Sequence, residues 1–383
     1  MKKLTVFLAL FILLIVLISC GGQKSADNII TLGLNYELTG DNPIIGKSSL
    51  EGVNLAIDEI NAAGGITING KQYFLAVKPL DNEFNPASSA VVAQTFFDDK
   101  NIVAMVGPND SAMCLGAQAI VENGLPAITP WATQVDITSG EWFFRACYTD
   151  DFQGEILAKY AYSYENTKTA AVLYDMSNDY NVGISKIFRE SYEKMGGKIV
   201  AYESYNAGEK DFSAQLTRII AANPDILLLP NFYAEVVDQA EQAVGLGYKG
   251  KFIGSDTWGD QLLLDLDVNN VFDGCVWCGH YALDIASPKA LAFIDSYHKK
   301  YGTTTFPNDI VALNYDTVYL YKIAIENAQS TDRKAIRDAL AKIEFYEGVT
   351  GDMRFHGTGD PTKSAVMIQI KDREFKFLDI INP

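Results

Sequence analysis

The sequence predicts an α/β protein of two lobes, each a doubly wound parallel sheet with helices on both faces. Three observations lead to this fold class. Strand and helix patterns alternate three times between residues 29 and 133, and the alternation restarts at Phe143. Helical patterns dominate beyond Tyr281, as expected if the chain crosses back to complete the first lobe. Regular alternation is typical of parallel sheets, whose crossover helices cover the sheet faces.

The first lobe is expected to open with four strands separated by three helices. The helix pattern at 47–63 has one apolar face and stops at Gly64-Gly65, while Pro86 suits the first turn of the next helix. The strands are expected at 29–36, 72–80, 102–107 and within 125–133, and the helices at 47–63, 86–100 and 111–124.

The second lobe repeats this design, and helices and short strands follow it. Its strands are expected at 143–147, 169–174, 198–205, 225–229 and 252–254, and its helices at 151–163, 182–195, 212–222 and 234–245. Later helices are expected at 288–301, 309–328 and 333–343, and strands at 352–355, 365–370 and 375–379, the last two as a hairpin. The predicted division is 29–148 with 281–348 for lobe 1, and 149–280 with 349–383 for lobe 2.

The N-terminus has the pattern of an export signal. Lys2 and Lys3 precede an apolar run at 4–18, which is short for a membrane span and suits a signal peptide. The run ends in Ser19-Cys20 and resembles the lipobox of bacterial lipoproteins. We therefore expect a signal peptide at 1–19, lipidation at Cys20 and a tether at 20–28; an uncleaved anchor helix is the alternative.

Charge and cysteine content exclude several classes of function. The net charge of −17 disfavours nucleic acid and a polybasic membrane surface. Cys275 and Cys278 with His280 resemble half a zinc site, but no second ligand pair is near, so we expect buried cysteines and no metal. With three histidines in the chain, a histidine-based nucleophile is disfavoured, and we expect neither cofactor nor enzymatic activity.

Polar residues follow two consecutive strands of the first lobe. Ser111 comes after the strand at 102–107, and Thr133 comes after the next one. Ligands of parallel sheets bind beyond the carboxyl ends of the strands. Ser111 also suits a helix N-cap, so two hydroxyls and a helix N-terminus could together hold a carboxylate. The alternative is that Ser111 only caps its helix and Thr133 only forms a turn.

Corresponding positions in the second lobe carry aromatic residues and one acid. They are Tyr180, Phe232 or Tyr233, and Asp256. A zwitterion needs donors for its carboxylate and an anion for its ammonium, and aromatic faces also stabilise cations. The combined set suits an α-amino acid held between two lobes, whereas capping by Asp256 and rim packing by the tyrosines are the alternatives.

Several segments together resemble a known family from about Ile30 to Phe377. The helix that ends in a double glycine and the Gly-Glu-Lys-Asp-Phe block are specific in combination. The matching segments are Leu38-Thr39-Gly40, Gly52 to Gly64-Gly65-Ile66, Asp81 with Asn85-Pro86, Val106-Gly107 with Ser111, Ile128-Thr129-Pro130, Ala207-Gly208-Glu209-Lys210-Asp211-Phe212, and Tyr315-Asp316. The chain resembles the leucine/isoleucine/valine-type substrate-binding proteins of ABC importers, which have the type I periplasmic binding fold of two lobes joined by three crossovers.

The resemblance implies roles for individual residues. Ser111 and Thr133 match the residues that bind the ligand carboxylate, with the backbone of Trp131 alongside. Asp256 matches the acid that binds the ammonium, with Asp in place of the commoner Glu, and Tyr180 matches a second-lobe tyrosine. The next aromatic position falls on Phe232, although Tyr233 would supply its lost hydroxyl.

Two departures from the family concern specificity. A family aromatic aligns with Ile45, and Asn109-Asp110 are more polar than a pocket for leucine requires. The resemblance implies an extracytoplasmic, lipid-anchored monomer that binds an amino acid, branched-chain or related, for ABC permease subunits. The alternatives are an amide or a small aromatic or carboxylic acid as ligand, or a ligand-sensing role that feeds a receptor.

Overall fold

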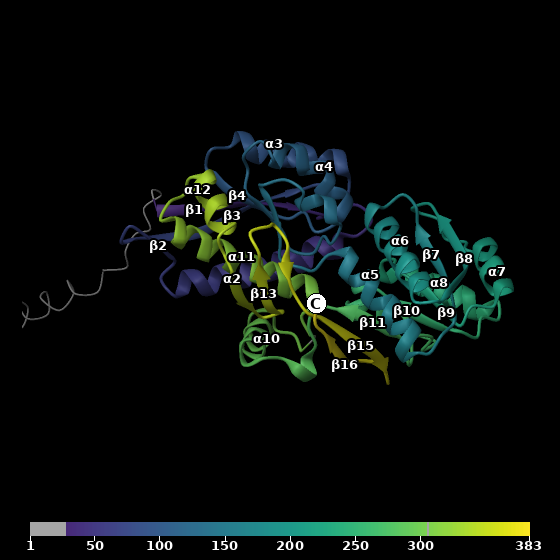
Figure 1. The fold of residues 1–383 in the computed structure, drawn as a ribbon. Helices are drawn as coiled ribbons and strands as arrows, with labels where there is room; N and C mark the ends of the chain where they lie inside the picture. Colours follow the sequence, from purple (N-terminus) through teal and green to yellow (C-terminus); the bar gives the residue numbers. More distant parts are fainter. Residues whose placement is uncertain (1–27, 305) are drawn as a thin grey trace, which may run out of the picture.

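The computed structural model describes residues 28–304 and 306–383. Its first sheet has six strands in the order β2-β3-β1-β4-β5-β6 (Figure 1). From β1 the chain moves outward to β3 and then reverses through β4, β5 and β6, so the sheet is doubly wound with its switch point between β1 and β4. The strands are β1 Ile29–Tyr36, β2 Ile66–Ile68, β3 Lys71–Asp81, β4 Ile102–Val106, β5 Ala127–Thr129 and β6 Phe143–Arg145.

The second sheet has seven strands in the order β16-β15-β11-β10-β9-β7-β8. Its strands from β7 to β11 repeat the winding of the first sheet, which confirms two doubly wound lobes. Both sheets are mixed, however, because β2 pairs antiparallel with β3, and β15 with β11 and β16. The strands are β7 Thr169–Asp175, β8 Lys198–Tyr205, β9 Ile226–Leu229, β10 Lys251–Gly254, β11 Val276–Gly279, β15 Ala365–Lys371 and β16 Glu374–Ile381.

Helices cover both sheets, as Figure 1 shows. They are α2 Pro43–Ala62, α3 Pro86–Asp98, α4 Ser111–Val121, α5 Asp150–Lys159, α6 Asp179–Lys194, α7 Ser213–Ala222, α8 Tyr233–Gly245, α9 Gln261–Leu266, α10 Pro288–Tyr301, α11 Asp309–Ala328 and α12 Arg333–Leu340. Short helical turns are η2 Val135–Thr138, η3 Tyr160–Tyr164, η4 Asp256–Trp258 and η5 Leu283–Ile285. Helix α2 begins four residues before the expected 47, because Pro43 fits its first turn.

Helices α10, α11 and α12 return to the first lobe, as expected. Their apolar residues share one core with β1, α2 and β4. Two tyrosines tie α11 to the sheet: Tyr36 Oη donates to Asn314 Oδ1 at 2.5 Å, and Tyr321 Oη donates to the Met105 carbonyl at 2.6 Å. The chain therefore leaves the first lobe, builds the second and crosses back.

A small third sheet follows these helices. It contains β12 Phe345–Gly348, β13 Gly351–Phe355 and β14 Pro361–Thr362. The β12–β13 hairpin spans the expected lobe boundary at 348/349, and Met353 and Phe355 of β13 pack in the core of the first lobe. The chain then enters β15 and β16, whose expected hairpin is confirmed. Asp372 and Arg373 form its two-residue turn with positive φ angles of 53° and 60°.

The predicted signal peptide at 1–19, Cys20 and the tether to residue 27 lie outside the described residues. Within the described part of the chain, no helix is both long and apolar enough to cross a membrane. The four cysteines of this part are buried and free: Cys114, Cys147, Cys275 and Cys278.

Candidate functional site

Two helix N-termini, one from each lobe, meet across the cleft. Asp110 caps α4, because its Oδ1 accepts from the N–H groups of Ala112 at 2.8 Å and Met113 at 3.4 Å. Asn178 caps α6 in the same way. The two caps also bond to each other, since Asn178 Nδ2 donates to Asp110 Oδ2 at 3.1 Å. This hydrogen bond joins the two lobes directly.

The expectation that Ser111 caps α4 is wrong. Asp110 has the extended backbone of a cap, and Ser111 is already the first helical residue. An Asp oxygen carries charge and accepts the N–H groups of the first turn well. Ser111 Oγ is therefore not used by its own helix and instead accepts from the Gln134 N–H at 3.4 Å.

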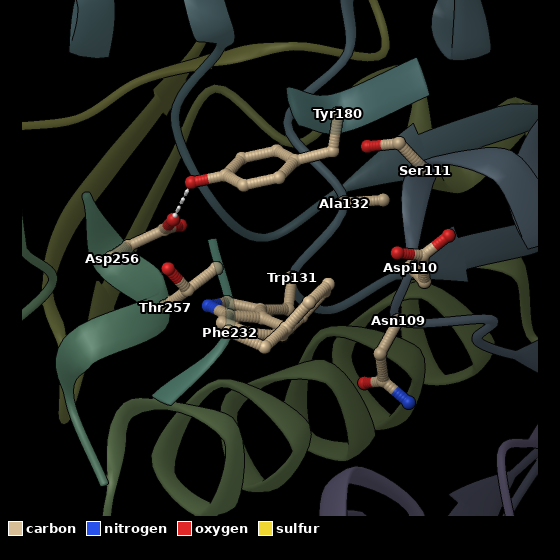
Figure 2. A pocket seen from close by; sticks show the side chains of 9 residues that line it. All are labelled: Asn109, Asp110, Ser111, Trp131, Ala132, Tyr180, Phe232, Asp256 and Thr257. Carbon is tan, nitrogen blue, oxygen red and sulfur yellow. Dashed lines mark hydrogen bonds between the residues drawn. The ribbon is translucent and has the colours of Figure 1, made fainter. Parts of the chain in front are cut away.

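A small cavity lies between these helix ends. Figure 2 shows Tyr180 on one side, the rings of Trp131 and Phe232 on the opposite side, and Asp256 and Asp110 at the two ends. Every side chain that lines the cavity is buried. The lining residues are Asn109, Asp110, Ser111, Trp131, Ala132, Tyr180, Phe232, Asp256 and Thr257.

Asp256 is oriented by two donors from its own lobe. Tyr180 Oη donates to Asp256 Oδ1 at 2.6 Å, and His280 Nε2 lies 3.3 Å from Oδ2. The His280 ring stacks on Tyr148 with 4.1 Å between the ring centroids. Burial, and then the charge of Asp256, raise the pKa of the Tyr180 phenol well above its ordinary value, so Tyr180 keeps its proton and donates.

Two buried polar groups come from the first lobe. Trp131 Nε1 has no hydrogen-bond partner in the described part of the protein, and the Thr133 hydroxyl lies beside the Asp150 carboxyl, with which it can hydrogen-bond. A buried donor without a partner costs free energy, so such groups commonly mark a place where a ligand binds. Both groups lie on the loop after β5, next to Ala132 of the cavity wall.

Asn109 and Asp110, the two residues before Ser111, are held by hydrogen bonds to Glu37. The Asn109 amide is engaged away from the cavity: Nδ2 donates to Glu37 Oε2 at 2.9 Å, and Oδ1 accepts from Asn314 Nδ2 at 3.0 Å. Glu37 also accepts from the Asn109 and Asp110 N–H groups. Burial raises the pKa of both Glu37 and Asp110.

A second small cavity adjoins the first, with Trp131, Asp256 and Thr257 shared between them. Ile45 and Tyr233 line this second cavity and not the first. Six of the expected ligand-binding side chains therefore line the first cavity: Asn109, Ser111, Trp131, Tyr180, Phe232 and Asp256.

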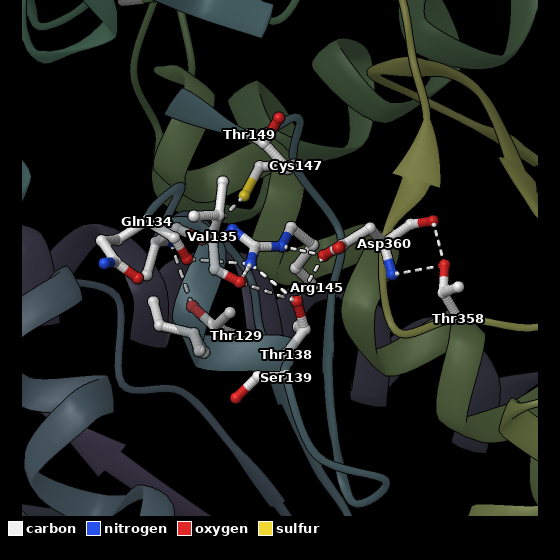
Figure 3. A network of polar contacts seen from close by, with 12 residues as sticks. Thr129, Gln134, Val135, Thr138, Ser139, Arg145, Cys147, Thr149, Thr358 and Asp360 are labelled. Carbon is white, nitrogen blue, oxygen red and sulfur yellow. Dashed lines mark hydrogen bonds and ion pairs between the residues drawn. The ribbon is translucent and has the colours of Figure 1, made fainter. Parts of the chain in front are cut away.

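Arg145 of β6 holds the loop that carries Trp131 and Thr133. Its guanidinium donates to the carbonyls of Ala132 and Gln134, to the Thr138 hydroxyl, and to Asp360 Oδ1 at 2.5 Å, as Figure 3 shows. Asp360 belongs to the segment that leads to the last crossover. The site loop and this segment are thus fixed to the same buried cation.

Sequence reasoning missed several residues of the site. Asp110 and Asn178 were detectable, because each is an Asp or Asn directly before a helix pattern, which is the signature of an N-cap. His280 and Thr257 had no such signal. Among residues 28–304 and 306–383, no group of three or more His, Cys, Asp or Glu side chains could hold a metal ion.

Comparisons with known proteins agree with this architecture. The family model described as "Periplasmic binding protein" matches residues 29–374. The Leu/Ile/Val-binding protein homolog 1 of Brucella abortus is 28% identical over 347 residues, which cover 90% of both chains.

Two solved structures are similar over nearly their whole length. A leucine-binding protein from Thermotoga maritima has a TM-score of 0.86 and 29% identity, covering 92% of this chain and 99% of the other. A branched-chain amino acid transporter substrate-binding protein from Streptococcus pneumoniae, in complex with isoleucine, has a TM-score of 0.85 and 32% identity. It covers 93% of this chain and 100% of the other.

Proposed function

The chain belongs to the periplasmic binding protein family, and from this premise we propose that it captures an α-amino acid between its lobes for an ABC importer. The observation that carries the proposal is the composition of one buried cavity. The Asp256 carboxylate comes from one lobe, and the Ser111 hydroxyl and the unpaired Trp131 Nε1 come from the other. These groups have the chemistry that a zwitterion requires.

In the proposed complex, Ser111, Thr133 and Trp131 hold the ligand carboxylate. Trp131 Nε1 supplies a donor that has no other described partner, and Thr133 adds its hydroxyl. Asp256 receives the ligand ammonium, and Tyr180 and His280 keep the Asp256 carboxylate in place. Phe232 packs against the aliphatic part of the ligand. The Phe232 ring lies beside Trp131, with 6.3 Å between the two ring centroids. Ile45 and Tyr233 shape the adjoining cavity.

Closure of the lobes is the proposed binding step, and no chemical step follows. The Asn178–Asp110 hydrogen bond and the Trp131–Phe232 contact both join side chains of opposite lobes. A ligand that bridges the lobes adds to these contacts and favours the closed form. The closed form then docks on the permease. We further propose a monomer that is lipid-anchored at Cys20 on the outer side of the membrane.

Isothermal titration of the purified, ligand-stripped protein with common α-amino acids tests this function. Each binder is compared with its N-acetylated form, which lacks the ammonium, and with its amide, which lacks the carboxylate. We expect one or a few amino acids to bind and both capped forms to lose most of the affinity. Mass spectrometry should recover the bound ligand unchanged. Failure of every α-amino acid, with binding of amides or simple carboxylic acids, would contradict the proposal.

A further inference from the structure

The Asp110 side chain is a second carboxylate that lines the ligand cavity. It lies at the end opposite Asp256 (Figure 2), and only 3% of its surface is exposed. A single α-amino group can neutralise only one of these two carboxylates. None of the nine residues that line the cavity is Lys, Arg or His, so the lining supplies no compensating cation.

The hydrogen bonds of Asp110 leave it able to accept one more donor. An ionised carboxylate offers about four lone-pair positions. Ala112 N and Met113 N occupy Oδ1, and Asn178 Nδ2 occupies one position on Oδ2. Oδ2 therefore keeps one acceptor position beside the cavity.

Asn109 also lines the cavity, but its side-chain amide is not available to accept a hydrogen bond from the ligand. Its amide nitrogen donates to Glu37 and its amide oxygen accepts from Asn314. Glu37 lies behind Asn109 and is fully buried, and burial raises its pKa. The acceptor that faces the ligand at this end of the cavity is therefore Asp110.

We propose that the ligand is an α-amino acid whose side chain ends in an N–H donor, an amide or an amine, and that Asp110 accepts this donor. This inference rests on the function proposed above. The ammonium of the ligand meets Asp256, and its side chain extends between Trp131 and Tyr180 toward Asp110 (Figure 2).

An aliphatic side chain fits this end less well. Its methyl groups would cover the remaining acceptor position of Asp110 without offering a donor, and a buried charged acceptor that loses water without replacement costs free energy. The methylene groups of a longer polar side chain still pack on Trp131 and Phe232. An ammonium beside these ring faces gains a cation–π attraction as well.

A matched set of ligands measures the preference by isothermal titration of the full protein. Lysine and norleucine differ only by the terminal amine, while glutamine carries a neutral amide. We expect lysine, glutamine or both to bind about 10- to 100-fold more tightly than norleucine, the range for a hydrogen bond to a charged group. Preference for glutamine over lysine identifies the amide as the donor, and the reverse order identifies the cation.

Two variants connect this preference to Asp110. Asp110→Asn keeps an acceptor for the cap of α4 and removes the charge, so the preference for lysine or glutamine over norleucine should fall about tenfold or more. Asn178→Ala removes the neighbour but leaves the carboxylate, and it should retain the preference. If leucine or norleucine binds the wild-type protein as tightly as lysine and glutamine, the inference is wrong and the proposed function stands. If no α-amino acid binds, both are wrong.

Discussion

His280 Nε2 lies 3.3 Å from Asp256 Oδ2, and both side chains are almost completely buried. Burial lowers the pKa of His280, so at neutral pH its ring is uncharged and donates one N–H to Asp256. A neutral donor orients the carboxylate without cancelling the charge that an ammonium needs.

Replacing His280 by Leu is expected to weaken amino-acid binding by about tenfold or more, because a hydrogen bond to a charged group contributes about 1.5–3 kcal/mol. Gln at the same position restores an N–H donor and should recover part of the affinity. Titration calorimetry of the three proteins measures this. Equal affinity of the Leu variant and the wild type would show that Tyr180 alone holds Asp256.

Asp256→Ala should cost roughly 2–5 kcal/mol of binding, because the ligand ammonium would then be buried without its counter-charge. Asp265→Asn, an exposed acid on the nearby α9, is the control and should bind as the wild type does. Thermal shift and calorimetry both measure the effect. Retained affinity in Asp256→Ala rules out the ammonium-binding role.

Asp150 should contribute stability to the ligand-free protein that is lost as pH rises from about 4 to 7, whereas His280, whose pKa is lowered by burial, acts in the opposite direction. Burial raises the pKa of Asp150 to about 7, so the folded state binds a proton there that the unfolded state, with an ordinary carboxyl pKa, has already lost. Asp309, raised to about 8, acts in the same direction. The slope from each group approaches about 1.4 kcal/mol per pH unit.

Urea denaturation at several pH values measures this slope. Asp150→Asn replaces the carboxyl with a neutral amide and should flatten the profile, whereas Asp151→Asn, at an exposed neighbour, should leave it unchanged. An unaltered slope in Asp150→Asn would assign the pH dependence to other groups.

Asp360→Ala should lower the free energy of unfolding by about 1–3 kcal/mol, because the buried Arg145 guanidinium would lose its counter-charge. The Arg145 side chain is 0% exposed and that of Asp360 is 36% exposed, so solvent reduces the effect below that of a fully buried pair. Asp352→Ala is the control. It breaks the ion pair with Arg354, in which both side chains are more than half exposed, and should cost little.

The alternation of strand and helix patterns predicted both lobes, because long elements with one buried face carry a periodic signal. Shorter elements carry too little of that signal. Strand β2 has three residues and α9 has six, and both were missed. The antiparallel pairings of β2 with β3 and of β15 with β11 were also missed, since strand direction depends on tertiary context.

The candidate site was predictable where it follows strand ends. Ser111, Tyr180, Phe232 and Asp256 come after different strands, and the carboxyl ends of parallel strands meet at one edge. The capping role of Asp110 was also predictable, because Asp110 directly precedes the helix pattern, although the cap was expected at Ser111. His280 follows Asp256 by 24 positions on a different strand, so their contact depends on the packing of β10 and β11.

The shared winding order of the two sheets makes the cleft nearly symmetric in its backbone but not in its side chains. Ser111 follows β4 and Phe232 follows the equivalent β9, while Trp131 follows β5 and Asp256 follows the equivalent β10. The repeated backbone alone would allow a ligand to bind in either of two opposite orientations. A zwitterion turned end for end would place its carboxylate against the Asp256 carboxylate, so the orientation with the ammonium at Asp256 is favoured.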